Sequence, residues 1–409
     1  MIKIGILALV LLGSLYKIAL SIVRYRSANN PTPANVADVY DAETYQTWKK
    51  YSAEHCRLEL ASNIVSLAIT LLLLGTNAYA AFVGLFPAGV FGQLFAVVLL
   101  ETLVGTVCGV VEGYISTMVI EQKYGFNRST MKTFVFDQIR SLIIGFGLSC
   151  GLVWLMAALH TSMGDWMIVL FAGVVFAFTM LFSFLYPIFS RLGNKFVPLE
   201  DGELKDRLMA LLTKHGYKVK AIEVMDASRR TTKLNAYFTG FGKMKTIVLY
   251  DNLLNAMTSD EICAIFAHEL GHGLHKDVLK SQILNIFYLL LMATAVWLVV
   301  GAEVLYMSFG FAEVNYGFAY ILVGIVLGIL QPLISLIINA RSRAAEYRAD
   351  RQAVLEGYGE AMISAFKKLA KDNFSHLAPS KINVVLEYSH PPLSRRVEEV
   401  EKEMARLAR

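Results

Sequence analysis

Charged residues are scarce in this 409-residue chain. Asp, Glu, Lys and Arg together make up 17% of it, whereas hydrophobic residues make up 56% and the mean hydropathy is +0.50. Soluble globular domains carry about 25% charged residues, so the composition excludes an ordinary soluble protein and indicates a membrane protein. The net charge is only +5 and no polybasic block is present. Nucleic acid is therefore not an expected partner.

Cysteine is scarce as well. The four cysteines, Cys56, Cys108, Cys150 and Cys263, are scattered and form no CxxC pair. A disulfide framework or a cysteine-based zinc site requires clustered cysteines at characteristic spacings. The pattern instead predicts reduced thiols that are buried or lie in the membrane.

Long apolar runs account for much of the chain. Seven of them reach the length of about 20 residues that a helix needs to cross a bilayer. They lie at 4–23, 59–83, 92–118, 139–159, 166–190, 282–306 and 318–340. A cleaved signal peptide is the alternative for the first run. Its length, and the basic residues Arg24 and Arg26 that follow it, favour a retained span.

Lysine and arginine are absent from three connections between these runs, 84–91, 160–165 and 307–317. Basic residues occur instead in 24–58, 119–138, 191–281 and the C-terminal tail. Since basic residues accumulate in cytoplasmic loops, seven spans with an outside N-terminus bring every basic segment to the cytoplasmic side. The integral, multi-pass topology in a lipid bilayer follows from this pattern.

Two polar regions are long enough to fold, and both fall on the cytoplasmic side. We therefore expect a membrane domain with five spans at 1–190 and two further spans at 282–340. The catalytic domain is expected in two parts, the first at 191–281 and the second at 341–409. The apolar spacing of Leu204, Leu208 and Leu211 predicts a helix at 200–214. Alternating residues predict strands at 219–225 and 246–250. Further helices are expected near 341–370 and 392–408.

The clearest chemical motif is His268-Glu269-Leu270-Gly271-His272. On a helix, residues four apart share a face, so both imidazoles can bind one metal ion, and Glu269 beside them can take a proton from the attacking water. Zinc suits this chemistry because it lowers the pKa of bound water to about 7 and polarises a carbonyl. A chance match on an ordinary helix is the alternative. Thr258 and Glu261 fit a capping box that begins the required helix and favour the zinc site.

A catalytic zinc usually has three protein ligands and one open position. Glu346 is the candidate third ligand, because it directly follows the last span on a separate element. Asp350 lies four residues further on the same helical face, where it can hydrogen-bond a ligand histidine. A solvated charged helix end is the alternative, and His275 is a rival ligand only three residues beyond His272.

These residues resemble the type I CAAX prenyl endopeptidases, a family of integral membrane zinc metalloproteases. The resemblance runs over most of the chain. The matching segments are the two zinc motifs 268–272 and 346–350, Asn235-Ala236-Tyr237-Phe238, Tyr114–Glu121 with Tyr124–Asn127, Tyr186–Phe189 with Asn194–Phe196, and His390-Pro391-Pro392-Leu393 followed by Arg396. One departure is Lys233-Leu234, where relatives often have small or imidazole residues.

The resemblance implies seven spans around a large water-filled chamber, with one zinc ion at its cytoplasmic end. It implies cleavage of C-terminal peptides beside a prenylated cysteine. Asn235, Ala236 and Tyr237 would line the substrate. His390 and Arg396 would stabilise the tetrahedral oxyanion; without the resemblance they would be interpreted as a helix-start histidine and a surface arginine.

The predicted fold class is a mainly α, polytopic membrane protein, with seven transmembrane helices around a hydrated chamber and a zincin-like catalytic domain containing a small β-sheet. The expected function is a zinc metalloendopeptidase acting on a peptide or protein substrate that is prenylated or membrane-associated. A quality-control protease for membrane proteins is one alternative. A non-catalytic channel or transporter is another, because Glu101 and Glu112 lie in or near the third span. The compact length favours a bacterial plasma membrane over the endoplasmic reticulum of a eukaryote.

Overall fold

Long apolar helices form most of the computed structural model, which describes residues 1–189, 191, 194–239 and 246–409. Six stretches are long and apolar enough to cross a membrane, and one of them, Met131–Ser183, contains two helices joined by a short turn at Gly164–Trp166. The described residues therefore contain seven such helices, which confirms the predicted fold class. They are α1 (Ile2–Ser27), α2 (Ala42–Gly75), α4 (Val90–Gly113), α5 (Met131–Met163), α6 (Met167–Phe189), α10 (Asp277–Val300) and α12 (Tyr316–Leu355).

The second and third spans differ in their limits from the prediction. The run 59–83 is not one helix, because α2 ends at Gly75 and Asn77 takes a left-handed conformation (φ 57°) before the short helix α3 (Ala78–Val83). Asparagine adopts this conformation more readily than most residues. The third span continues beyond α4 as a π-helix, Tyr114–Glu121.

The seven helices surround a cavity of about 390 Å³ to which each of them contributes residues. Its wall is mostly apolar, but Ser14, Lys17, Thr70 and Glu101 also line it. The helices thus enclose a cavity with polar groups, and its filling with water stays a prediction.

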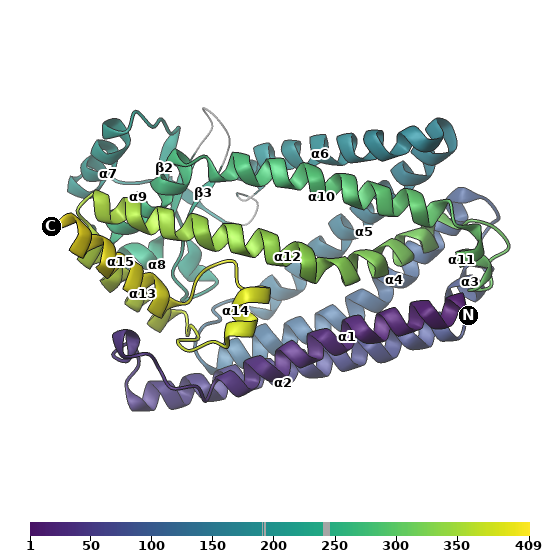
Figure 1. Cartoon of the computed structure of the whole chain (residues 1–409), viewed down its shortest axis with the longest axis horizontal. Coiled ribbons are helices and arrows are strands. Elements are labelled where there is room, and N and C mark those ends of the chain that lie inside the picture. Colours follow the sequence, from purple (N-terminus) through teal and green to yellow (C-terminus); the bar gives the residue numbers. More distant parts are fainter. Residues whose placement is uncertain (190, 192–193, 240–245) are drawn as a thin grey trace.

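The elements of the two polar regions gather at one end of the molecule, whereas the N-terminus, α3 and α11 (Glu303–Met307) lie at the other (Figure 1). A four-stranded sheet has the order β1-β2-β4-β3. Its strands are β1 (Phe196–Pro198), β2 (Ala221–Met225), β3 (Ala236–Thr239) and β4 (Thr246–Tyr250). Both predicted strands are present as β2 and β4, which pair in parallel. β3 pairs antiparallel with β4 and forms an edge of the sheet.

Six helices belong to the same end of the molecule as the sheet. They are α7 (Glu203–Lys214), α8 (Asp251–Ala256), α9 (Ser259–Leu274), α13 (Gly359–Asp372), α14 (Lys381–Glu387) and α15 (Leu393–Leu407). Buried side chains from α7, β4, α9 and α13, among them Leu208, Ile247, Phe266 and Met362, form one hydrophobic cluster. The amphipathic helix predicted at 200–214 is confirmed as α7.

The prediction of one helix near 341–370 was wrong, because parts of two helices occupy this range. α12 continues from the membrane span without a break to Leu355, and α13 begins at Gly359. Gly357 separates them with a left-handed φ of 86°, a conformation that glycine adopts without steric cost. At about 1.5 Å per residue, the 40 residues of α12 extend well beyond a hydrocarbon core of about 30 Å. One continuous helix therefore joins the membrane spans to the segment that carries Glu346.

Candidate metal centre

The helix with the two histidines, α9, begins with the expected capping box. The Thr258 side chain accepts a hydrogen bond from the Glu261 backbone N–H, and the Glu261 carboxylate accepts one from the Thr258 N–H at 2.8 Å. These contacts satisfy two of the donors that a helix start leaves free. Most of α9 is buried, His268 included, so the motif lies on a firmly held helix.

Gly271, in the middle of the motif, allows α9 to cross α12 at very short range. A Cβ atom at this position would lie 2.9 Å from the Cα of Ala349 and 3.0 Å from the Cβ of Gln352. Any larger residue would push the two helices apart. The close crossing brings the histidine face of α9 to the turn of α12 that carries Glu346.

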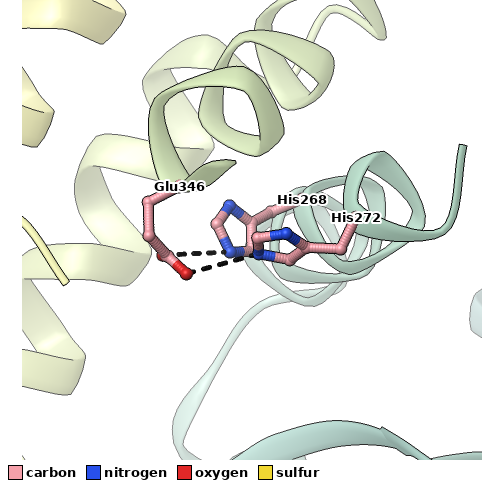
Figure 2. Close-up of side chains that lie close together, drawn as sticks. All are labelled: His268, His272 and Glu346. Atoms are coloured by element: carbon pink, nitrogen blue, oxygen red, sulfur yellow. Dashed lines mark ion pairs between the residues drawn. The ribbon is translucent and has the colours of Figure 1, made fainter. Parts of the chain in front are cut away.

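His268, His272 and Glu346 meet at this crossing, with candidate ligand atoms all within 4.8 Å of one another (Figure 2). His268 Nε2 lies 3.6 Å from Glu346 Oε2, and His272 Nε2 lies 3.4 Å from Glu346 Oε1. Two imidazole nitrogens and one carboxylate are a donor set typical of catalytic zinc. Glu346 Oε2 is buried and makes no hydrogen bond within the described residues, and only cationic or imidazole groups lie within ion-pair distance of it, which fits a carboxylate that binds a cation. His275, the rival ligand, is the C-cap of α9 and lies outside this group of three.

Each histidine is held on its other nitrogen by a carboxylate. His268 Nδ1 lies 2.8 Å from Asp350 Oδ1, as proposed for Asp350, and His272 Nδ1 lies 3.0 Å from Asp277 Oδ2. Asp277 in turn accepts a hydrogen bond from Arg348 at 2.9 Å. A carboxylate at Nδ1 favours the tautomer with its proton there, which leaves the Nε2 lone pair free for a metal.

Asp277 is a site residue that the sequence reasoning missed. It is the first residue of α10, after the left-handed Lys276 (φ 55°). The only sequence signal for Asp277 is that it lies five residues after His272. This spacing does not place two residues on one helical face, and in the structure the chain turns between them.

Arg396 and His390 come to the same centre from the C-terminal tail. Arg396 donates to both oxygens of Asp350, at 2.5 and 2.9 Å, and lies 3.2 Å from Glu346 Oε2. Its guanidinium stacks 4.0 Å above the ring centroid of Phe366. His390 Nδ1 is 3.0 Å from the same Glu346 oxygen, and its side chain is 65% exposed. Arg396 is thus buried behind the ligands, whereas His390 lies at the open side.

The electrostatic field of the centre favours a positive charge. Burial lowers the pKa of His272, but the nearby carboxylates of Glu346 and Asp277 outweigh this effect and raise it to about 9. The same carboxylates would stabilise a bound divalent cation. Burial raises the pKa of the Glu269 carboxyl above its ordinary value, although His268 and His272 act in the opposite direction. Glu269 is half-buried and adjoins the ligand His268 in the sequence.

Asn235, Ala236 and Tyr237 lie at the start of the edge strand β3, which also contacts α9. The Asn235 side chain is exposed, and its Oδ1 accepts a hydrogen bond from the Ala236 N–H at 2.9 Å. Its carbonyl accepts one from the Tyr250 N–H at 3.1 Å. Among the strands that the structure describes, β3 pairs with β4 alone and is thus an edge strand of the sheet.

Two family models together match nearly the whole chain. Residues 198–404 match Peptidase family M48, and residues 2–191 match a model described as CAAX prenyl protease N-terminal, five membrane helices. The family of residues 198–404 implies a metal cofactor, consistent with the group of donors on α9 and α12.

Named relatives agree with this match. The chain is 33% identical to CAAX prenyl protease 1 homolog of Oryza sativa subsp. japonica, over 70% of this chain and 68% of the relative. It is 28% identical to CAAX prenyl protease 1 of Saccharomyces cerevisiae, over 89% and 87%. The crystal structure of S. mikatae Ste24p superposes with a TM-score of 0.92 at 26% identity, covering 98% of this chain and 99% of that one.

The fold and the donor set together define an integral membrane metallopeptidase. The chain belongs to peptidase family M48 and carries the family's N-terminal membrane region of the CAAX prenyl protease type. The alternative of a non-catalytic channel or transporter is thereby set aside.

Proposed function

We propose that this protein is a zinc endopeptidase that cleaves C-terminal peptides next to a prenylated cysteine. One observation carries the metal assignment: two histidine Nε2 atoms and the Glu346 carboxylate converge, while each histidine is held at Nδ1 by a carboxylate. The names of the relatives support the substrate class. We propose one zinc ion per chain, held by His268, His272 and Glu346.

Zinc at this position supplies a Lewis acid that polarises the scissile carbonyl and makes water acidic enough to lose a proton near neutral pH. Glu269 takes that proton and passes it to the nitrogen of the leaving amine as the peptide bond breaks. Burial raises the pKa of its carboxyl, which brings its basicity closer to that of a general base working near neutral pH.

His390 is the better placed of the two proposed oxyanion donors. It is exposed on the open side of the centre and close to Glu346, so a substrate carbonyl can approach it. Arg396 already donates to both Asp350 oxygens, and it lies 3.2 Å from Glu346 Oε2. Its contacts support a role in orienting the ligands, and donation from it to an oxyanion stays a prediction.

An extended substrate would pair with the outer edge of β3. Main-chain hydrogen bonds of such an added strand give affinity without sequence preference, and pockets for alternate side chains give selection. In this proposal the segment Asn235–Tyr237 aligns the scissile bond with the metal.

We further propose that the catalytic end faces the cytoplasm, since the basic connections adjoin it and the connections without Lys or Arg lie at the other end. The relatives named above are eukaryotic. Residence in a bacterial plasma membrane therefore stays a prediction that they do not support.

Metal analysis combined with peptide cleavage tests the proposal. The purified protein should contain one zinc per chain and cleave a farnesylated C-terminal peptide in preference to the unmodified one. Glu346→Ala should lose most of the metal. Glu269→Gln should keep the metal and the fold but lose about 100- to 10,000-fold in turnover. Near-normal turnover by pure Glu269→Gln protein, or full zinc in Glu346→Ala, would contradict the assigned roles.

A further inference from the structure

The residues that lead into β3 are paired with the membrane domain through their backbone. Asn127 and Thr231 form an isolated antiparallel bridge. The Arg128 N–H donates to the Arg230 carbonyl at 3.0 Å, and the Thr232 N–H donates to the Phe126 carbonyl at 3.2 Å. Since 126–128 belong to the connection between the π-helix and α5, a membrane-domain loop holds the start of the substrate strand.

The next residue, Lys233, is held through its side chain. Its Nζ lies 3.0 Å from Glu121 Oε1 and donates to the Tyr51 hydroxyl oxygen at 3.2 Å. The Tyr51 hydroxyl donates to the same Glu121 oxygen at 2.6 Å. The Lys233 and Glu121 side chains are only 34% and 17% exposed, so water and salt screen this ion pair less than one on the open surface.

The backbone of Lys233 and Leu234 is held from the catalytic side. Asn252 Nδ2 donates to the Lys233 carbonyl at 2.7 Å. The Asn373 side chain accepts from the Leu234 N–H at 2.9 Å and donates to the Leu234 carbonyl at 3.2 Å. Asn235 and the edge strand follow directly. The segment before the strand is thus fixed between the membrane helices and the C-terminal tail.

Glu121 connects these contacts because of its place in the fold. It is the last residue of the π-helix, a geometry that occurs frequently at functional sites. Its carbonyl accepts hydrogen bonds from the Phe126 and Asn127 N–H groups, at 2.8 and 3.2 Å. One residue therefore holds both the loop that pairs with Thr231 and the ammonium group of Lys233.

We propose that the Lys233–Glu121 ion pair is a positioning device that fixes the outer edge of β3 against the membrane helices. The inference rests on the proposed function, in which that edge binds the substrate. Without the pair, β3 keeps β4 on one side and its lead-in keeps its backbone contacts, but the side-chain anchor of Lys233 is lost and the substrate edge becomes less ordered. Such disorder weakens binding of substrate and transition state alike, so it raises KM with little change in kcat. Neither residue touches the reacting atoms.

Four variants and two independent readouts test this proposal. Lys233→Met and Glu121→Gln should each speed amide hydrogen exchange of peptides covering 236–239 and raise KM, both by about 10-fold. Zinc content and melting temperature should stay near wild type. The double variant should be no worse than either single one, because the two residues act as a unit. Lys233→Arg keeps the positive charge, so its exchange rate at 236–239 and its KM should both stay near wild type. Lys218→Met, which removes an exposed lysine between α7 and β2, is the matched control and should change neither.

Unchanged exchange at 236–239 in both single variants would overturn the proposal, whatever substrate the protein cleaves. A fall in kcat at constant KM, or additive effects in the double variant, would overturn it too. Failure of the proposed function would look different: the wild-type protein itself would lack zinc-dependent cleavage, while the exchange measurement would still decide the anchoring. If Glu121→Gln does not fold, the contrast between Lys233→Met and Lys233→Arg gives the same decision.

Discussion

His272 and Asp277 belong to consecutive helices, and the histidine Nδ1 lies 3.0 Å from the aspartate Oδ2. The opposite nitrogen of the same ring faces Glu346 at 3.4 Å. The carboxylate thus fixes both the orientation of the ring and its tautomer. Asp277 is itself held by Arg348, so a chain of contacts on the outer side of the ligands determines where the metal-binding nitrogen points.

Asp277→Asn should weaken zinc binding by about 10- to 100-fold, the usual cost of removing a carboxylate that holds a ligand histidine. The amide keeps the shape of the side chain but not its charge, so the histidine becomes a weaker base. Competition with a chromophoric chelator measures the affinity. Asp206→Asn, on the exposed side of α7, is the control and should bind zinc normally. Wild-type affinity in Asp277→Asn would show that the contact is only structural.

Glu261 should contribute to stability in a pH-dependent manner. It is 4% exposed and accepts hydrogen bonds from Thr258 N–H, Lys368 Nζ and Ser364 Oγ, at 2.8, 2.7 and 2.6 Å. Burial raises its pKa, but these partners outweigh burial and lower it below the ordinary value. The folded protein therefore releases this proton more readily than the unfolded chain. The stabilisation is complete above the unfolded pKa of about 4.3 and is lost as the pH falls through the lower folded value.

Glu261→Gln should accordingly lower stability at neutral pH by about 1–3 kcal/mol. Thermal melting in detergent between pH 7 and pH 3 measures the difference between the two proteins. That difference should shrink in acid, where Glu261 of the wild type becomes protonated. A constant difference across this range would contradict an ionised Glu261.

Much of the centre could be predicted from sequence because its donors follow helical spacing. His268 and His272, and likewise Glu346 and Asp350, are four residues apart, and each pair shares a face of one helix. The role of Gly271 could not be predicted from the sequence. A glycine is needed there because Ala349 and Gln352 approach it closely once α9 and α12 have packed.

The continuity of α12 shows a second limit. The change from apolar to polar residues near 340 looked like the end of a helix, and the sequence alone did not show what the polar part would contact. In the structure that part is covered by α9 and α15 and contains the buried residues Glu346 and Asp350. Tertiary packing thus stabilises the helix beyond residue 340, and the helix ends at Leu355, just before the left-handed Gly357.

The topology predicts that the connections without Lys or Arg face away from the catalytic end. In a variant without the four native cysteines, Ser162→Cys and Ala312→Cys should react with an impermeant thiol reagent only from the side opposite the catalytic domain. Lys218→Cys should react only from the catalytic side. All three positions are exposed, so accessibility within the fold is not limiting. Labelling of Ser162→Cys and Lys218→Cys from the same side would contradict the seven-span arrangement.

The last prediction concerns Asn235, whose side chain admits two roles. Its Oδ1 bonds the next N–H at 2.9 Å, as an asparagine that ends a turn commonly does. It is also exposed at the beginning of an edge strand, where its side chain can bond the backbone of an added substrate strand.

As a substrate clamp, Asn235→Ala should lower kcat/KM by about 10-fold or more, in line with the loss of a positioned polar contact, while zinc content and melting temperature stay near wild type. As a turn residue, the same change should lower the melting temperature and leave the kinetics of zinc-loaded molecules unchanged. We expect the first outcome, because the Asn235 carbonyl is already bonded to Tyr250 and keeps the strand in register without the side chain. Asn255→Ala, an exposed asparagine on α8, is the control and should affect neither quantity. A lower melting temperature with unchanged kcat/KM per zinc-loaded molecule would rule out the clamp.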